Sequence, residues 1–297
     1  MPELWTIKSA LEWTIGYLKR KGDPNPRLSA QWLMSHSTNL SRVELYTNYD
    51  KPLSADERAV LHDAVERRGK CEPLQYICGK ASFRHITLDV EPGVLIPRPE
   101  TEVLVDVALS KLIDVDVAAP CCKLYVADIG TGSGCIACSI ATEREDAIVY
   151  ATDISSQAIC VASKNADKLN VAQRITFIQC NLGDAMPESV IGKFSLIVSN
   201  PPYIPSALLE ELDTEVKNFE PMIALDGGEN GLAIFEELLK WSKLALLPCG
   251  WLCVELHEDC LDSACVLAQN CGFGNCEIID DLAGKHRVLT AQKYANK

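Results

Sequence analysis

Apolar residues repeat at helical spacing through the first part of the chain. Between residues 3 and 20 they recur every three or four positions, which is the spacing of one helix face. A second helix is expected over residues 26–37. Ser54 and Glu57 form a capping box that opens a third helix, over residues 54–68. We therefore predict that the chain begins with a small helical bundle.

From about residue 100 the pattern changes to an alternation of helices and strands. The expected strands span residues 123–130, 147–153, 175–181, 194–200, 250–257, 275–281 and 286–292. The expected helices span residues 100–113, 133–144, 155–169, 206–217, 229–246 and 258–271. Alternation of this kind predicts an α/β fold with a doubly wound, mostly parallel seven-stranded sheet and helices on both faces.

Three segments follow from these patterns. Residues 1–72 are expected to form the helical bundle, and residues 99–297 the α/β domain. Between them, glycine and proline residues interrupt short extended runs over residues 73–98, which predicts a connector resembling a β-hairpin.

Charge is distributed unevenly along the 297 residues. Residues 1–75 carry 11 Lys and Arg against 10 Asp and Glu, whereas the remainder carries 17 against 31. An acidic α/β part argues against binding to a nucleic acid backbone, which requires basic surface. It is compatible with a protein substrate.

The chain lacks the apolar run of about 18 residues that a membrane helix needs. Its first residues are acidic and offer no basic region of a signal or transit peptide, so we expect a cytoplasmic protein.

The 14 cysteines are then expected to be reduced. Cys135 and Cys138 are the only C-x-x-C pair and lack the partners of a zinc site, so we expect core thiols and no metal.

A glycine-rich turn follows the first strand of the α/β domain, as Gly130-Thr131-Gly132-Ser133-Gly134. The spacing is G-x-G-x-G, and Cys135 stands where a dinucleotide fingerprint needs glycine. This disfavours a ligand whose pyrophosphate must be held. The alternative interpretation of the run is a tight turn without a ligand.

Asp153 stands at the end of the second strand, where a carboxylate can accept hydrogen bonds from both hydroxyls of a ribose. An equally simple interpretation is a cap for the helix that follows. Together, the glycine run and Asp153 favour an adenosyl ligand without phosphates, and S-adenosylmethionine fits that description.

The fourth strand ends in Asn200-Pro201-Pro202-Tyr203. The Asn200 side-chain oxygen and the Pro201 carbonyl can accept both protons of one planar NH2 group, while Tyr203 packs on its flat face. Accepting these protons raises the electron density on a poorly nucleophilic nitrogen and aims it at an electrophile. A proline-rich turn without chemistry is the alternative. We predict that Asn200, Pro201 and Tyr203 carry the reaction.

The whole pattern resembles the release factor glutamine methyltransferases, the PrmC/HemK family. The resemblance rests on runs spread over most of the chain, namely EPLQYI at 72–77, LIPRPETE at 95–102, GTGSG at 130–134, NPPYIP at 200–205, FEP at 219–221 and ALDGG at 224–228. NPPY alone is shared with amino-methyltransferases of nucleic acids, whereas the combination is much more specific.

The resemblance implies N5-methylation of the glutamine amide in the Gly-Gly-Gln loop of peptide chain release factors. It implies that the helical domain docks the release factor. We expect a monomeric enzyme without a nucleic acid or membrane partner. The residues it assigns to S-adenosylmethionine are Gly130, Thr131, Gly132, Ser133, Gly134, Asp153, Asn181, Leu182 and Asn200. Those it assigns to the substrate are Asn200, Pro201, Pro202, Tyr203, Phe83 and Arg98.

One departure from the family concerns the tip of the third strand. The family commonly has Asp followed by an aromatic residue near the adenine, whereas Asn181-Leu182 stands here. Asn181 can still bond the edge of the adenine, and Leu182 can pack on its ring.

The alternative function is methylation of an amino group in DNA adenine or ribosomal RNA guanine.

Overall fold

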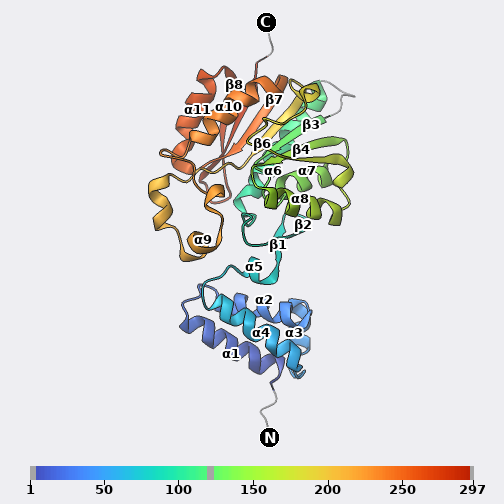
Figure 1. Ribbon diagram of the computed structural model, residues 1–297, viewed down its shortest axis with the longest axis vertical. Helices are drawn as coiled ribbons and strands as arrows, with labels where there is room; N and C mark the ends of the chain where they lie inside the picture. Colours follow the sequence, from blue (N-terminus) through green and yellow to red (C-terminus); the bar gives the residue numbers. More distant parts are fainter. Residues whose placement is uncertain (1–4, 119–123, 295–297) are drawn as a thin grey trace. The chain divides into compact units, whose positions relative to one another are not determined.

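The structure, a computed structural model, describes residues 5–118 and 124–294 (Figure 1). The chain divides into two compact units. The first comprises Met1–Lys80 and Asp213–Phe219, and the second comprises Ala81–Leu212 and Glu220–Lys297. None of the described helices combines the length and the apolar character needed to cross a membrane.

The first unit is helical. Its helices are α1 (Ile7–Arg20), α2 (Pro26–Thr38), α3 (Arg42–Thr47), α4 (Ala55–Arg68), α5 (Leu74–Cys78) and α9 (Thr214–Phe219). Apolar side chains from α1, α2 and α4 form its core, as the helical periodicity predicted. The expected capping box is present, because Ser54 accepts from the Glu57 amide and the Glu57 carboxylate accepts from the Ser54 amide. Residues 3 and 4 of the first expected helix lie outside the described residues.

A buried ion pair joins two segments of this unit. The Arg68 guanidinium donates to Asp23 at 2.7 Å, and the two side chains are only 6% and 3% exposed. The Ser29 hydroxyl on α2 donates to the same carboxylate, so α2 and α4 are tied together through Asp23.

The second unit begins with a two-stranded sheet of β1 (Lys80–Phe83) and β2 (Ile86–Asp89). Arg84 lies between the two strands with a left-handed φ of 50°. Its guanidinium bonds Glu143 and Asp106, and its backbone amide bonds the Glu102 carboxylate. These bonds fix the turn to the α/β fold.

The main sheet has the strand order β5-β4-β3-β6-β7-β9-β8. Adjacent strands from β5 to β7 are parallel, and β9 is antiparallel to both of its neighbours. The predicted doubly wound, mostly parallel sheet is therefore confirmed. Its strands are β3 (Leu124–Ile129), β4 (Ala147–Asp153), β5 (Ile175–Gln179), β6 (Phe194–Ser199), β7 (Leu246–Glu255), β8 (Phe273–Asp280) and β9 (His286–Lys293). Lys123, the first residue of one expected strand, lies outside the described residues.

Helices cover both faces of this sheet (Figure 1). One apolar cluster joins the sheet to α6 (Glu100–Ala118) and α7 (Cys135–Glu143), beside α8 (Ser156–Lys168). A second cluster joins the other face to α10 (Ala233–Ala245) and α11 (Leu261–Asn270). The strand order reverses around β3, and ligands of such sheets bind at the carboxyl ends of the strands next to that reversal.

Two expected helices differ from the prediction. The segment 206–217 forms a 3₁₀ helix at Ser206–Glu211 and then the short α9, because the backbone at Leu212 is extended. The helix expected over 229–246 begins only at Ala233, since Gly231 has a φ of 72° that a helix does not allow. The short helices α3 and α5 were not predicted, because too few residues carry their periodicity.

Candidate active site

One cavity opens where β3, β4, β5 and β6 end. Eight of the residues expected from the sequence line it, namely Gly130, Gly132, Asp153, Asn181, Leu182, Asn200, Pro201 and Pro202. Four segments that are separate in the sequence therefore meet in one cavity.

The glycine-rich turn forms part of the wall. Gly130 and Gly132 have φ of 75° and 55°, and a Cβ atom at either position would meet no atom within 4 Å. The amides of Gly130 and Thr131 donate to the Thr152 carbonyl, which fixes the turn to β4. The turn therefore presents bare backbone to the cavity, which allows a ligand to approach it closely.

Thr131, Ser133 and Gly134 do not line the cavity. The side chains of Thr131 and Ser133 are buried, and the Thr131 hydroxyl donates to Asp128 at 2.6 Å. Gly134 is the N-cap of α7 with a φ of 81°. These three residues therefore support the structure of the turn and do not form the surface of the cavity.

Asp128 lies beneath the turn, and the sequence analysis did not single it out. It is fully buried at the end of β3, and the Ala137 amide donates to its carboxylate as well. Burial raises its pKa to about 7, although the bonds from Thr131 and Ala137 oppose the rise. The sequence signal for Asp128 was an acidic residue near the end of an otherwise apolar strand.

Asp153 holds the backbone on two sides of the cavity. One carboxylate oxygen accepts from the Gly132 amide at 2.9 Å, and the other accepts from the Ser155 amide at 2.8 Å. The N-cap of α8 is Ser155, whose hydroxyl accepts from the Ala158 amide. Burial raises the pKa of Asp153. Each oxygen keeps a second lone pair, so the carboxylate can also bond hydroxyls of a ligand.

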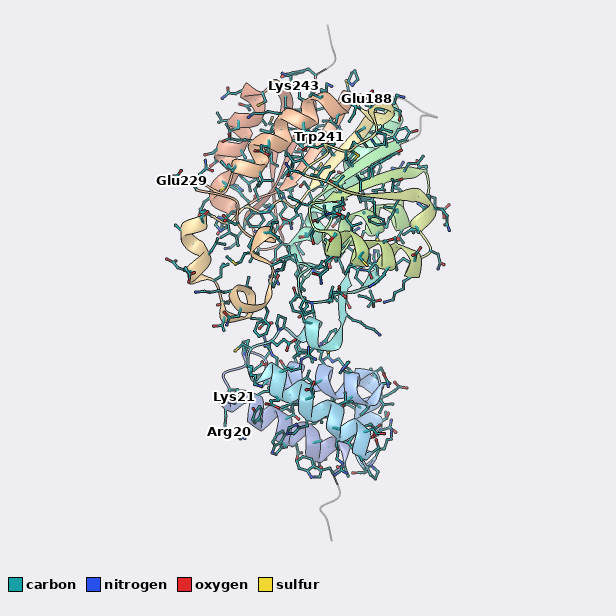
Figure 2. All side chains as sticks on the ribbon, in the orientation of Figure 1. Arg20, Lys21, Glu188, Glu229, Trp241 and Lys243 are labelled. Carbon is teal, nitrogen blue, oxygen red and sulfur yellow. The ribbon has the colours of Figure 1, made fainter. Side chains whose placement is uncertain are left out.

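Asn181 and Leu182 follow β5 at the cavity. The Thr152 hydroxyl donates to the Leu182 carbonyl at 2.6 Å, and Leu182 has a φ of 46°. The next residue is Gly183, where a Cβ atom would lie 2.1 Å from the ring of Trp241. Trp241 is carried by α10 (Figure 2). The loop after β5 is thus held by contacts with β4 and with α10, and Leu182 gives the cavity an apolar wall.

Asn200 is held from two directions. The preceding residue, Ser199, donates its hydroxyl to the Ile129 carbonyl at 2.6 Å, which links the ends of β6 and β3. The Asn200 side-chain amide donates through Nδ2 to the Thr101 hydroxyl at 3.0 Å. This bond uses the nitrogen of the amide, so Oδ1 stays available as an acceptor at the cavity.

Tyr203 lies beside the cavity rather than in its lining. Its hydroxyl donates to the Glu255 carboxylate at 3.4 Å, and its ring lies 6.4 Å from that of His257. Burial is the main cause of a raised tyrosine pKa, so the hydroxyl stays protonated at neutral pH.

Phe83 and Arg98 also lie outside the lining. Phe83 is 1% exposed within the apolar core that contains Leu104 and Val126. Arg98 donates to Glu220 at 2.6 Å, and this ion pair joins the segments that carry Leu95 and Pro221, both of which line the cavity. Their contribution to the cavity is therefore indirect.

Several lining residues were not anticipated by the sequence analysis. They are apolar and come from the loop before α6 and from the loop after Glu220, namely Val94, Leu95, Pro221, Ile223 and Ala224. Leu95, Pro221 and Ala224 belong to the LIPRPETE, FEP and ALDGG runs, whereas Val94 and Ile223 lie next to these runs and carried no signal of their own.

Cys135 and Cys138 are buried in α7. Burial raises the pKa of both thiols, that of Cys138 to about 12, so they stay protonated. Among residues 5–118 and 124–294, no cluster of three or more His, Cys, Asp or Glu side chains could hold a metal ion.

Two family models match the chain. One is described as the PrmC N-terminal domain and matches residues 9–79, and the other is described as the methyltransferase small domain and matches residues 105–218. The two matches fall on the helical first part and on the α/β part.

Curated relatives are similar over nearly the full length. A release factor glutamine methyltransferase from Geobacter sulfurreducens is 42% identical over 288 residues, covering 97% of this chain and 97% of the relative. The protein of the same name from Rhodopirellula baltica is 39% identical over 293 residues, with the same coverage of both chains.

A solved structure shares the fold. The hMettl16 catalytic domain in complex with MAT2A 3′UTR hairpin 6 superimposes with a TM-score of 0.56, covering 79% of this chain and 83% of that chain. The sequences are 15% identical, so this likeness concerns the fold alone.

Proposed function

This chain belongs to the release factor glutamine methyltransferase family, and on that premise we propose that it methylates the N5 nitrogen of the glutamine in the Gly-Gly-Gln loop of peptide chain release factors. S-adenosylmethionine is the proposed methyl donor. The observation that carries the proposal is that Asn200 shares one cavity with the glycine-rich turn and Asp153.

The cavity fits this donor by its chemistry. The open space at Gly130 and Gly132 admits a ligand against the backbone, and the spare lone pairs of Asp153 suit ribose hydroxyls. Ile154 and Leu182 offer apolar surface for an adenine ring, with Asn181 at its polar edge. When bound, S-adenosylmethionine supplies an electrophilic methyl group on a sulfonium centre.

The protein's own contribution is to orient the acceptor amide. Asn200 Oδ1 and the Pro201 carbonyl accept the two protons of the glutamine NH2 group, which raises the electron density on its nitrogen. Positioning of this kind, together with preorganised acceptors, lowers the barrier without prior removal of a proton. The amide proton can leave after transfer, when the nitrogen has become strongly acidic.

The remaining substrate contacts are proposed in the same way. Pro202 and Tyr203 complete the slot for the amide, and the Arg98 pair with Glu220 supports the loops around it. Phe83 supports the slot from the core. The helical unit docks the release factor, consistent with the nearly balanced charge of residues 1–75. The enzyme acts as a monomer in the cytoplasm.

A comparison of acceptors tests this function. Purified enzyme with labelled S-adenosylmethionine should methylate an intact release factor, and peptide mass spectrometry should find the methyl group on the glutamine of its Gly-Gly-Gln loop. A release factor with that glutamine replaced by alanine is the matched control. Transfer to that control at an equal rate, or preferentially to DNA or ribosomal RNA, would refute the proposal.

A further inference from the structure

The ALDGG run at residues 224–228 takes part in no step described so far, yet it lies against the segment that carries the proposed amide slot. Ile204 and Asp226 form a parallel β-bridge. The Ile204 amide donates to the Leu225 carbonyl at 2.9 Å, and the Gly227 amide donates to the Ile204 carbonyl at 2.8 Å. The two segments are therefore paired directly after the slot.

A side chain of this run holds the pairing in place. The Ser206 hydroxyl donates to Oδ1 of Asp226 at 2.7 Å, and the Gly228 amide donates to the same oxygen at 3.0 Å. The Ser206 amide in turn donates to the Gly228 carbonyl at 2.9 Å. Asp226 thus closes its own loop and ties that loop to Ser206.

Two glycines let this loop approach the backbone of Tyr203 closely. A Cβ atom at Gly227 would lie 2.6 Å from the Tyr203 Cα, and a Cβ atom at Gly231 would lie 2.3 Å from the Tyr203 carbonyl oxygen. Both contacts are with backbone atoms, so rotation of a side chain cannot relieve them. A larger residue at either position must displace Tyr203 or the loop.

The segment with the slot depends on such a contact because it has few donors of its own. Three of the five residues that follow Asn200 are prolines, which carry no amide proton. Only Tyr203 and Ile204 can donate a backbone hydrogen bond there, and the Ile204 amide is bound by the loop. Residues 225–231 therefore supply a hold that the proline-rich segment cannot supply itself.

We propose that residues 225–231 form a clamp on Tyr203 and Ile204, in which Asp226, Gly227 and Gly231 are positioning residues that set the place of the acceptor amide for methyl transfer. This inference rests on the proposed function of the same site. The three residues lie outside the cavity lining, so they act on the slot through the backbone of Tyr203 and Ile204.

Two substitutions press on the slot, and two others make matched controls. Gly227→Ala and Gly231→Ala each place a Cβ atom against Tyr203. Gly250→Ala creates a similar backbone contact, at 2.9 Å, with the first residue of β6, at the end of that strand remote from the slot. Gly192→Ala reproduces the positive φ of Gly231, at 77° against 72°, but its Cβ would approach no atom beyond its chain neighbours closer than 3.9 Å.

We expect Gly227→Ala and Gly231→Ala each to lower single-turnover methyl transfer by on the order of 10²-fold, since small displacements of a reacting group have effects of this size. The affinity for S-adenosylmethionine and the KM for the release factor should change little, so that the loss falls on kcat. The controls Gly250→Ala and Gly192→Ala should transfer methyl groups at close to the wild-type rate.

A second pair of variants tests the clamp without adding a Cβ atom. Asp226→Ala removes the acceptor of both bonds and should lower the transfer rate roughly tenfold, the scale of one or two hydrogen bonds. Asp226→Asn keeps an oxygen that can accept from Ser206 and Gly228, so it should restore the rate.

The inference is overturned if the variants of Gly227 and Gly231 lose no more rate than their controls, or if cofactor affinity falls in step with the rate. If these glycine variants fail to fold, equal rates for Asp226→Ala and Asp226→Asn overturn it.

A failure of the proposed function can be told apart from a failure of the clamp. If wild-type enzyme does not methylate a release factor, the proposed function fails, and hydrogen exchange measured by NMR still tests the clamp. The Ile204 amide should exchange slowly in wild type and in Asp226→Asn, and faster in Asp226→Ala. Equal exchange in all three proteins would contradict the clamp.

Discussion

The carboxylate of Asp153, which we assign to the cofactor ribose, also accepts hydrogen bonds from the protein's own backbone. Its two oxygens accept from Gly132 and Ser155, which belong to two different walls of the cavity. From the sequence alone, Asp153 is either a ribose ligand or a helix cap. The cap of α8 proves to be Ser155, and Asp153 instead joins the two loops that a ligand would contact.

Removal of this carboxylate should weaken cofactor binding. We expect Asp153→Ala to lower the affinity for S-adenosylmethionine by roughly 1–3 kcal/mol, because ribose hydroxyls lose their acceptor. Asp146→Ala, just before the other end of β4, is the matched control and should bind normally. Isothermal titration calorimetry measures both, and an unchanged dissociation constant for Asp153→Ala would contradict the assignment.

Asp128 should make folding stability depend on pH. Its carboxyl titrates near 4 in an unfolded chain and at about 7 in the fold, because it is buried. Between these values the folded state retains a proton that the unfolded state has lost, so stability falls as pH rises from about 4 to about 7. Urea unfolding at pH 5 and pH 8 should show a smaller fall for Asp128→Asn than for wild type. An equal fall in both proteins would show that Asp128 titrates normally.

For single residues, the sequence points to those that stand at the end of one strand. Asn200 and Asp153 each follow an apolar run directly, and both line the cavity. The bond between Asn200 and Thr101 and the bond between Tyr203 and Glu255 were not predicted, because each joins segments that are separate in the sequence.

Among the elements, the tip after β5 depends on a close contact with α10. Gly183 leaves no room for a side chain, since a Cβ atom there would lie 2.1 Å from the Trp241 ring. Neither residue is conspicuous in the sequence, because the contact joins a loop to a helix well separated from it along the chain.

A methyl group at Gly183 should therefore destabilise the fold. We expect Gly183→Ala to cost about 1–3 kcal/mol, the usual effect of overpacking. Gly16→Ala in α1 is the contrasting control, because its Cβ would meet only the end of Arg20, at 3.5 Å, and alanine favours a helix by about 0.5–1 kcal/mol. Thermal unfolding distinguishes the two, and a Gly183→Ala protein as stable as wild type would contradict the packing argument.

The elements themselves were predicted with uneven success. All seven strands of the main sheet were expected, and the parallel strands from β5 to β7 were marked by the apolar runs that buried parallel strands form. The segment 206–217 has the composition of a helix but divides at Leu212, where the backbone becomes extended. Local patterns do not reveal such a break.

For the whole molecule, the two compact units have separate apolar cores. Every residue that lines the cavity belongs to the second unit. We therefore propose that the second unit alone binds the cofactor, and the proposed role of the helical unit is to recognise the release factor.

Deletion of residues 1–70 separates these roles. The shortened enzyme should bind S-adenosylmethionine with unchanged affinity, since the cavity lining is intact, but it should fail to methylate an intact release factor. Calorimetry and a labelled-methyl assay measure the two properties. Methylation at the full-length rate would show that the helical unit is not needed for docking.

The central claim is that Asn200 orients the acceptor amide. Single-turnover methyl transfer to the Gly-Gly-Gln loop, measured beside cofactor affinity for wild type and Asn200→Ala, tests it most directly. The rate should fall by on the order of 10²–10³-fold, the effect of losing one preorganised polar partner, while cofactor affinity changes far less. A near-wild-type rate for Asn200→Ala would contradict the account.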